Sequence, residues 1–202
     1  MTVRLLVAED MAVVRGALVS LLEREPDFEV VAEVERGDLV LPAARRNEPD
    51  VALLDVTMPG QDGLSAANDL ACAMPQVKVM ILTESSCPGT FRAAMEAGVC
   101  GFVRKTADVR TLVDGIRSVA HGGQTFDTGL AVAAMRLGAN PLRAREAELL
   151  GMLAEGATVG ECARTLYLAP GTVRNCLRRA VDRLGARGRT DAIRIARQNG
   201  WI

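Results

Sequence analysis

The stretch DVALLDVTMPGQDG, residues 50–63, decides the fold of the N-terminal part of this chain. A short apolar run, VALLDV, carries one carboxylate at Asp55 and breaks at once into Met58-Pro59-Gly60. A short apolar run that is bounded by turn residues is typical of a strand buried on both faces. Asp55 is therefore either a cap or turn residue, or part of a site that opens where the strand ends.

Four further apolar runs flank this stretch, at residues 3–8, 28–34, 77–83 and 99–103. Helical patterns fit residues 38–46, 63–73, 90–97 and 108–120. The clearest helical period comes earlier, with Val13, Val14, Ala17, Leu18, Leu21 and Leu22 on one face. Strands that alternate with helices predict βαβ units. We predict a doubly wound, flavodoxin-like α/β domain with a five-stranded parallel sheet in the order 2-1-3-4-5.

The alternation stops after residue 120. HGGQTFD, residues 121–127, is turn-like, and residues 129–137 predict a short helix. No strand signal follows, and residues 143–155, 159–167, 171–184 and 190–199 predict four short helices. We therefore predict a domain over 1–120, a linker over 121–140 and a small all-α domain over 141–202.

Charge is divided between the two predicted domains. Residues 1–140 carry 13 Lys and Arg against 19 Asp and Glu, whereas residues 141–202 carry 11 against 6, for a net charge of −1. This division favours nucleic acid as the partner of the basic domain. The five cysteines and one histidine show no CxxC and no metal-binding spacing, which favours reduced thiols in the cytoplasm. Neither a membrane span nor a signal peptide is predicted.

The strand ends predict a site in the α/β domain. Glu9 and Asp10 end the first strand and Asp55 ends the third, and in the predicted order these strands are neighbours, so three carboxylates converge. A divalent cation would offset their repulsion, and oxygen ligands favour Mg²⁺. Thr83 and Lys105 end the next two strands and suit the oxygens of a phosphoryl group that Asp55 has accepted. Each residue taken alone could instead be a helix cap or a turn residue.

Residues 3–120 resemble a response-regulator receiver domain. The residues that carry the resemblance are Glu9-Asp10, Asp55, Met58-Pro59-Gly60, Asp62-Gly63, Thr83, Gly101-Phe102 and Lys105. The resemblance implies that a sensor histidine kinase phosphorylates Asp55. It also implies that Asp10, Asp55 and the Thr57 backbone carbonyl hold Mg²⁺, with Glu9 assisting through water. Thr83 and Phe102 would form a switch pair.

The C-terminal sequence predicts a helix-turn-helix. In the predicted helix over 171–184, Val173, Leu177, Ala180 and Leu184 share one stripe, and Asn175, Arg178, Arg179 and Asp182 lie opposite, with Arg174 at the flank. Pro170-Gly171 suits a helix start, and a second short helix precedes it. Arg and Asn side chains can read DNA bases or bind phosphates. An ordinary helical bundle with a solvated, arginine-rich surface is the alternative interpretation.

The same segment is similar to the LuxR-type DNA-binding domain of NarL/FixJ response regulators. Within that family the chain looks DesR-like in the stretches VAED, PGTF, GTVRN and the closing GW. The matching residues are Arg145-Glu146, Leu149-Leu150, Ala154-Glu155-Gly156, Glu161, Ala163, Leu166, Pro170-Gly171-Thr172-Val173, Leu184-Gly185 and Arg189-Thr190. The resemblance implies that Arg174, Asn175 and Arg178 read DNA and that Thr172 contacts a phosphate. Arg179, which the helical period places on the same polar face, is a further candidate for DNA binding.

Several residues depart from the two family patterns. Glu84 follows Thr83 where a small residue is usual, and its charge would hinder an anionic phosphodonor. Ala169 replaces the usual cap residue of the recognition helix, which should cost about 1 kcal/mol. Cys176 stands where histidine is usual, and Gly160 should weaken its helix by roughly 1 kcal/mol.

We interpret the chain as a two-domain transcription regulator, not an enzyme, with at most slow autophosphatase activity. Phosphorylation of Asp55 would promote a homodimer that binds two half-sites on double-stranded promoter DNA. The candidate dimer surface comprises Val13, Leu18, Val109, Leu112 and Ile116, although each of these could instead face the sheet. The alternatives are a receiver that works without phosphate, which Glu84 leaves open, and an Mg²⁺-dependent aspartyl-phosphate hydrolase.

Overall fold

The residues around Asp55 fold as strand β3 (Val51–Asp55), all five of whose residues are buried. The computed structural model describes residues 2–84, 87–136, 138 and 140–202. It divides into two units, Met1–Ser86 with Ala93–Leu130, and Cys87–Arg92 with Ala131–Ile202. The predicted strands all lie in the first unit, and the four predicted C-terminal helices lie in the second.

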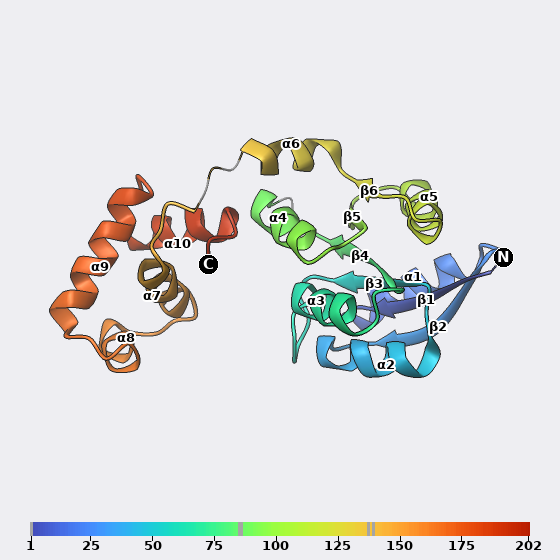
Figure 1. Ribbon diagram of the computed structural model, residues 1–202, viewed down its shortest axis with the longest axis horizontal. Helices are drawn as coiled ribbons and strands as arrows, with labels where there is room; N and C mark the ends of the chain where they lie inside the picture. The colour runs from blue at the N-terminus through green and yellow to red at the C-terminus, as the bar shows by residue number, and fades with distance from the viewer. Residues whose placement is uncertain (1, 85–86, 137, 139) are drawn as a thin grey trace. The chain divides into compact units, whose positions relative to one another are not determined.

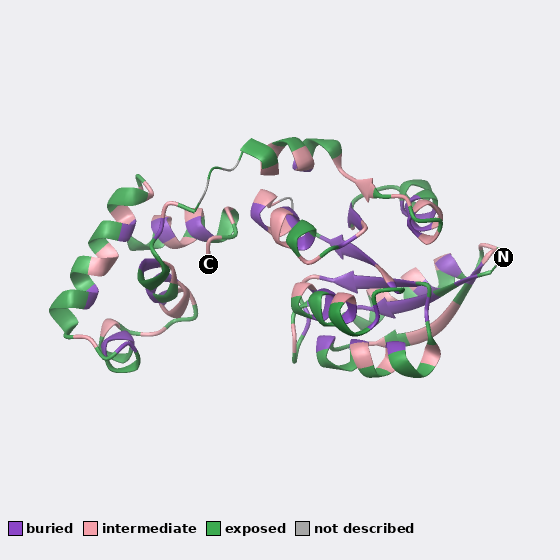
Figure 2. Ribbon diagram, viewed as in Figure 1, coloured by how far each residue is buried: buried purple, intermediate pink, exposed green. Residues whose placement is uncertain are grey.

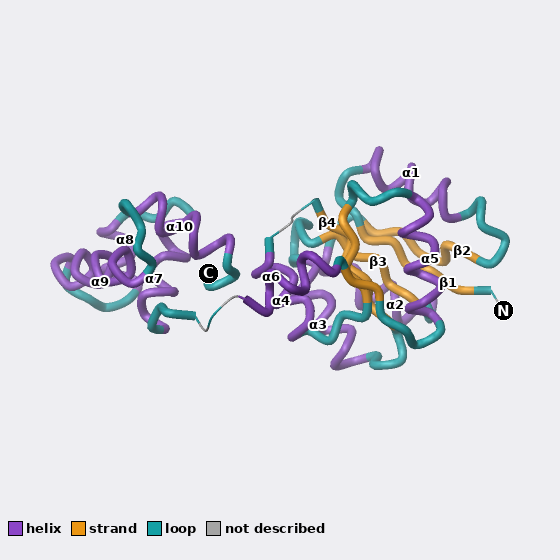
Figure 3. The backbone as a smooth tube through the Cα atoms, turned by 90° about the horizontal axis from the view of Figure 1, so that it is seen from above, coloured by secondary structure: helices purple, strands orange, loops and turns teal. Residues whose placement is uncertain are grey.

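The sheet of the first unit is entirely parallel (Figure 1), and Figure 3 shows its strands in orange. Its other strands are β1 (Val3–Ala8), β2 (Phe28–Val34), β4 (Lys78–Thr83), β5 (Gly101–Arg104) and β6 (Thr125–Phe126). The order is β2-β1-β3-β4-β5-β6, which confirms the predicted order of the first five strands. The order reverses between β1 and β3, which places a ligand-binding crevice at their carboxyl ends.

A sixth strand corrects the prediction of five. Thr125 and Phe126 lie within the predicted linker and pair with Gly101 and Phe102 of β5. Two residues are too few to produce an alternation that sequence patterns could reveal, so β6 depends on the exposed backbone edge of β5 for its hydrogen bonds. The linker prediction also included Leu137 and Ala139, which lie outside the described residues.

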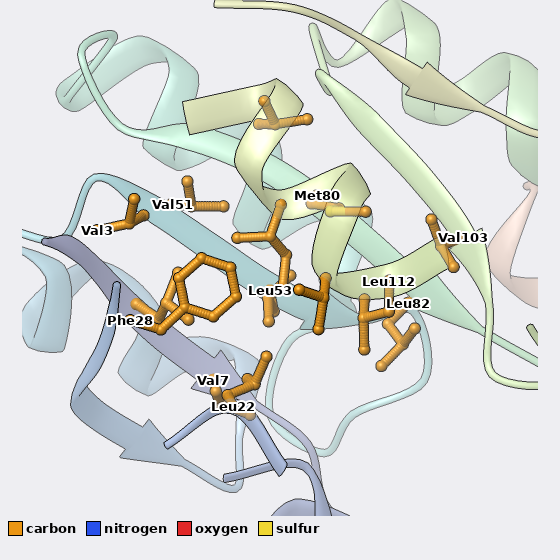
Figure 4. Packing of buried hydrophobic residues seen from close by; sticks show 14 of the residues in the cluster. Val3, Val7, Leu22, Phe28, Val51, Leu53, Met80, Leu82, Val103 and Leu112 are labelled. Carbon is orange, nitrogen blue, oxygen red and sulfur yellow. The ribbon is translucent and has the colours of Figure 1, made fainter. Parts of the chain in front are cut away.

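Helices cover both faces of the sheet. They are α1 (Ala12–Leu22), α2 (Val40–Asn47), α3 (Gly63–Ala73), α4 (Pro88–Glu96) and α5 (Val109–Ala120), with a 3-10 turn at Gly37–Leu39. Helices α1 and α5 pack on one face, where Leu22 and Leu112 lie in one cluster with Leu53 and Met80 (Figure 4). Helices α2 and α3 pack on the opposite face. The central strands β3 and β4 are almost entirely buried (purple in Figure 2), and burial from both sides is the reason that they are almost continuously apolar.

The second unit is all-helical. After α6 (Thr128–Arg136), which begins in the first unit, come α7 (Ala144–Ala154), α8 (Val159–Thr165), α9 (Pro170–Arg183) and α10 (Arg189–Gln198). Two buried clusters hold the last four together, one centred on Leu149 and Val173 and the other on Leu150 and Ala180. The four helices match the predicted ones, so both the α/β and the all-α parts of the predicted fold are confirmed.

Candidate functional site

Three carboxylates meet at the carboxyl ends of β1 and β3. One oxygen each from Glu9, Asp10 and Asp55 lies within 4.8 Å of the others. Glu9 and Asp55 are buried, with 1% and 7% of their surfaces exposed, whereas Asp10 is exposed. The structure thus brings together the acidic residues that were predicted from adjacent strand ends.

Lys105 lies directly against two of these carboxylates. Its Nζ is 2.7 Å from Glu9 Oε2 and 3.0 Å from Asp55 Oδ2. The Lys105 backbone N–H donates to the Thr83 carbonyl at 2.8 Å, which fixes this residue at the end of β5. Burial lowers the pKa of Lys105, but hydrogen bonds and charge from Glu9 and Asp55 outweigh burial, so the pKa stands above its ordinary value. One permanent cation therefore faces three acids, which leaves the cluster with a formal excess of negative charge.

A pocket of about 350 Å³ opens above this cluster. Its lining residues are Asp10, Met11, Asp55, Val56, Thr57, Thr83, Glu84 and Lys105. Thr57 and Glu84 are exposed, whereas Thr83 is 3% exposed. Asp55 thus lies on the wall of an open, polar cavity, and Glu84 adds a further carboxylate to the lining.

The loop after Asp55, which carries Val56 and Thr57 on the pocket wall, is fixed by short-range contacts. The Gly63 backbone N–H donates to the Val56 carbonyl at 2.8 Å, and a Cβ on Gly63 would lie 1.9 Å from the Asp55 carbonyl oxygen. Only glycine permits this close approach of two backbone segments. Asp62 then caps α3 by accepting hydrogen bonds from Leu64 N and Ser65 N. The Asp62-Gly63 pair therefore holds the loop that carries Thr57.

Thr83 and Phe102 lie on the same face of the sheet. Phe102 of β5 pairs with Ile81 of β4, and Ile81 and Thr83 point to the same side because they are two residues apart. Phe102 is fully buried. The two residues predicted to act as a switch pair are therefore on neighbouring strands and the same face, with the aromatic ring inside the protein.

The recognition helix predicted from the sequence is α9, and its two faces differ as predicted. Val173 and Ala180 are fully buried, and Leu177 is partly buried. The exposed residues are Thr172, Arg174, Asn175, Arg178 and Arg179. Among the described residues, no hydrogen bond or ion pair engages the side chains of the three arginines of this set. Their charges are therefore available to an anionic partner.

The helix before α9 begins with a capping box that the sequence analysis missed. Thr158 Oγ1 accepts a hydrogen bond from Glu161 N, and Glu161 Oε2 accepts one from Thr158 N at 2.7 Å. The T-x-x-E signature of residues 158–161 was visible in the sequence. A capping box stabilises a helix start by an amount similar to the cost of Gly160, so it offsets the weakness predicted there.

Helix α9 itself begins without a side-chain cap. Ala169 occupies the cap position with extended backbone angles (φ −67°, ψ 144°), and Pro170 is the first helical residue. We expect Ala169→Ser to raise the free energy of unfolding by about 1 kcal/mol, because the hydroxyl would accept a hydrogen bond from a free N–H of the first turn. Thermal unfolding of the full chain checks this, and an unchanged midpoint would contradict it.

Cys176 lies on the packed side of α9. It is partly buried, and its Sγ is 3.9 Å from the Arg145 carbonyl oxygen. Burial raises the pKa of the thiol, so it stays protonated near neutral pH. At a position where histidine is usual, the neutral Cys176 side chain therefore packs between α9 and α7.

The residues of the candidate dimer surface separate into two groups. Val13 and Val109 are 84% and 51% exposed, and Leu18 is partly buried beside an apolar groove between α1 and α5. Leu112 and Ile116 are buried in the core cluster under α5. Ile116 is fully buried, so the structure corrects its inclusion, whereas Leu112 also lines the groove and stays a prediction.

Comparisons with known proteins agree with both units. The family model described as "Response regulator receiver domain" matches residues 5–117, and "Bacterial regulatory proteins, luxR family" matches residues 140–196. The transcriptional regulatory protein YvfU of Bacillus subtilis (strain 168) is 39% identical over 200 residues, covering 99% of this chain and 100% of the relative. The transcriptional regulatory protein DesR of the same organism is 36% identical, covering 99% of each chain.

A solved structure shares the fold of nearly the whole chain. It is described as two RcsB dimers bound to two parallel DNAs, and it matches with a TM-score of 0.70 at 20% identity, covering 98% of this chain and 99% of that one. Among the described residues, no helix is long and apolar enough to span a membrane.

A doubly wound domain with an acidic pocket, followed by a helix-turn-helix domain, defines a DNA-binding transcription regulator. The chain belongs to the response regulators, and its LuxR-type domain places it among those of the NarL/FixJ type. Proteins that join these two domains are typically regulators and not enzymes.

Proposed function

We propose that Asp55 accepts a phosphoryl group from a sensor histidine kinase, and that this event controls dimerisation and promoter binding. The observation that carries the proposal is the position of Asp55 in the pocket, with its carboxylate 3.0 Å from Lys105 Nζ and in the same cavity as Thr83. An Asp that served only as a turn residue would have no need of a buried cation and a hydroxyl on two other strands.

The phosphoryl group passes directly from the phosphohistidine of the kinase to Asp55. An Asp55 oxygen forms a bond to phosphorus as the P–N bond of the phosphohistidine breaks, and the histidine nitrogen keeps the electron pair. Lys105 then pairs with a phosphoryl oxygen, and Thr83 donates a hydrogen bond to another. The turn of Thr83 toward the phosphoryl group alters the space beside Phe102, which lies on the same face of the sheet.

The donor set of the pocket fits Mg²⁺. Three carboxylate oxygens lie within 4.8 Å of one another, and a hard divalent cation prefers oxygen ligands of this kind. Asp10, Asp55 and the Thr57 backbone carbonyl would hold the ion, and Glu9 would assist through water. When bound, Mg²⁺ neutralises negative charge that gathers during transfer of the phosphoryl group.

Glu84 is the residue that favours the alternative function, a receiver that works without phosphate. Its carboxylate lines the same pocket and repels an anionic donor, as a receiver that works without phosphate would require. The presence of Asp10, Asp55, Thr83 and Lys105 together favours phosphorylation, with at most slow autophosphatase activity. An aspartyl-phosphate hydrolase is disfavoured because such enzymes usually carry the nucleophile in a DxD motif at the end of the first strand, and Glu9-Asp10 there do not form that motif.

The exposed face of α9 supplies the proposed DNA contacts. Arg174, Asn175, Arg178 and Arg179 would enter the major groove, where Arg pairs with guanine or phosphate and Asn with adenine, and Thr172 would contact a phosphate. Two copies of the domain would bind half-sites about one helical turn apart. Because chromosomal DNA is the ligand, the protein acts in the cytoplasm.

The exposed apolar residues of α1 and α5 are the proposed dimer surface. Val13 and Val109 are largely exposed, and Val109 lines the groove together with Leu18. Apolar surface of this kind is stabilised by association with a second copy. The homodimer would form when the receiver is phosphorylated.

One experiment tests phosphorylation and dimerisation together. Protein treated with a small phosphodonor and Mg²⁺ should gain the mass of one phosphoryl group and sediment as a dimer. Val109→Glu should gain the same mass but remain a monomer, because a buried unpaired charge is costly at an interface. Leu39→Glu is the matched control, because Leu39 is 41% exposed on the same unit and lies outside the proposed surface.

The possible outcomes separate the two parts of the proposal. Absence of any mass gain would overturn phosphorylation and favour the phosphate-independent alternative. A mass gain without dimers would overturn only the dimerisation. A phosphorylated Val109→Glu variant that still dimerises would assign the interface to another surface.

A further inference from the structure

Tyr167, in the turn between α8 and α9, has a backbone conformation that favours glycine. Its φ is +54°, and it follows Leu166, the C-cap residue of α8. The Tyr167 N–H donates to the Arg164 carbonyl, and the Leu168 N–H donates to the Ala163 carbonyl at 2.9 Å. This paired pattern is the Schellman motif, whose left-handed position is usually glycine.

The other three helices of the same domain end with the same motif and do use glycine. The residue after the C-cap is Gly156 (φ +92°) for α7, Gly185 (φ +59°) for α9 and Gly200 (φ +63°) for α10. In each case the glycine N–H and the next N–H donate back into the helix as they do at Tyr167. Four equivalent helix ends thus contain three glycines and one tyrosine. The tyrosine is strained because its Cβ crowds the following carbonyl oxygen.

No interaction described for the Tyr167 side chain within the domain offsets this strain. It is 95% exposed, and it belongs to neither of the two buried clusters described for this unit. The apolar contact that accompanies the motif is made by the next residue, Leu168. Among the described residues, no hydrogen bond of the phenol group is found. A strained residue whose side chain lies in solvent points to a partner outside the chain.

We infer that Tyr167 contacts the DNA backbone, donating its phenol O–H to a phosphate beside the groove that α9 enters. Tyr167 is three residues before Pro170, so its Cα lies at most about 11 Å from the start of α9. In a helix-turn-helix the first helix and the turn run along the phosphates while the second helix enters the groove. Tyrosine is among the residues that bind phosphate oxygens. This inference rests on the proposed contact of α9 with DNA.

The test measures DNA affinity and thermal stability of the full-length protein. The probe is a fluorescein-labelled, mixed-sequence DNA duplex, because a phosphate contact does not depend on base sequence. Tyr167→Phe should bind about tenfold more weakly, because it loses a hydrogen bond to a charged group. The salt dependence should be unchanged, since tyrosine carries no charge. Tyr167→Gly should bind at least as weakly as Tyr167→Phe, yet melt several °C higher.

Glu48 provides a matched control. It is the other described non-glycine residue with a left-handed backbone (φ +44°), and it is exposed at the end of α2. Glu48→Gly relieves the same kind of strain in the receiver domain, so it should raise the melting temperature but leave DNA affinity unchanged.

Comparison with Arg178→Ala separates the two possible failures. If Arg178→Ala weakens binding but both Tyr167 variants bind like the natural protein, Tyr167 makes no DNA contact and the inference is overturned alone. If Arg178→Ala also binds normally, on a promoter duplex as well as on the mixed-sequence one, α9 does not face the DNA, and the proposed interface fails together with this inference. Weakened binding by Tyr167→Phe, at an unchanged salt slope, supports it.

Discussion

Replacement of Asp55 by Asn is expected to abolish the phosphoryl adduct completely. The amide has no anionic oxygen with which to attack phosphorus, and it cannot form an acyl phosphate. The natural protein, treated with a small phosphodonor and Mg²⁺, should gain one phosphoryl group that hydroxylamine removes. Mass spectrometry of the intact protein measures the difference directly.

The Asp55→Asn variant should remain folded, so the loss is chemical. Lys105 keeps its partner Glu9 at 2.7 Å, and one of three mutually repelling carboxylates is removed. Asp69→Asn is the matched control, because Asp69 is exposed on α3 and accepts a hydrogen bond only from Gln61 among the described residues. Control protein should be phosphorylated like the natural one. An adduct on Asp55→Asn would assign the phosphoryl group to another residue.

The second large effect is expected at α9, where Arg174→Ala and Arg178→Ala should each weaken promoter binding about tenfold to a hundredfold. An arginine that pairs with a base edge contributes about 1–3 kcal/mol of discrimination. An arginine that binds a phosphate instead weakens binding to all sequences and lowers the salt slope by about 1. Affinities measured over a range of salt concentrations, on promoter and mixed-sequence duplexes, distinguish the two roles.

Arg46→Ala is the control for loss of one positive charge. Arg46 is exposed on α2, in the other unit of the chain. Its removal should leave both the affinity and the salt slope unchanged. Binding by the Arg174 and Arg178 variants that equals that of the control would refute the assignment of α9 as the helix in the groove.

Much of the acidic site could be predicted because of a general property of parallel sheets. The carboxyl ends of the strands meet at one edge, so residues that end neighbouring strands lie together however far apart they are in the sequence. That rule brought Glu9, Asp10 and Asp55 to one place and set Thr83 and Lys105 beside them, as the pocket shows. The distances, and the ion pair that Lys105 forms with both Glu9 and Asp55, required the structure.

Helical periodicity predicted the buried and exposed residues of α9 correctly. It could not predict which apolar residues of α1 and α5 are buried and which are exposed. A helical stripe states which residues face a core, and Val173 and Ala180 are buried as their spacing predicted. On α5, Val109 and Ile116 are both apolar, yet one is half exposed and the other fully buried. A wide apolar face has an edge, and the position of that edge depends on how the helix packs against the sheet.

The sequence by itself determined the order of strands and helices, the division into an acidic and a basic domain, and the set of residues at the strand ends. These follow from local periodicity, charge and chain direction, which are properties of short segments. Only the tertiary structure decided that β6 extends the sheet, that Ile116 belongs to the core, and that Tyr167 takes a left-handed conformation where three equivalent helix ends have glycine. The first two depend on a backbone edge and a packing partner, which exist only once separate segments of the chain have come together. The third is a dihedral angle of a local turn, which residue periodicity does not report.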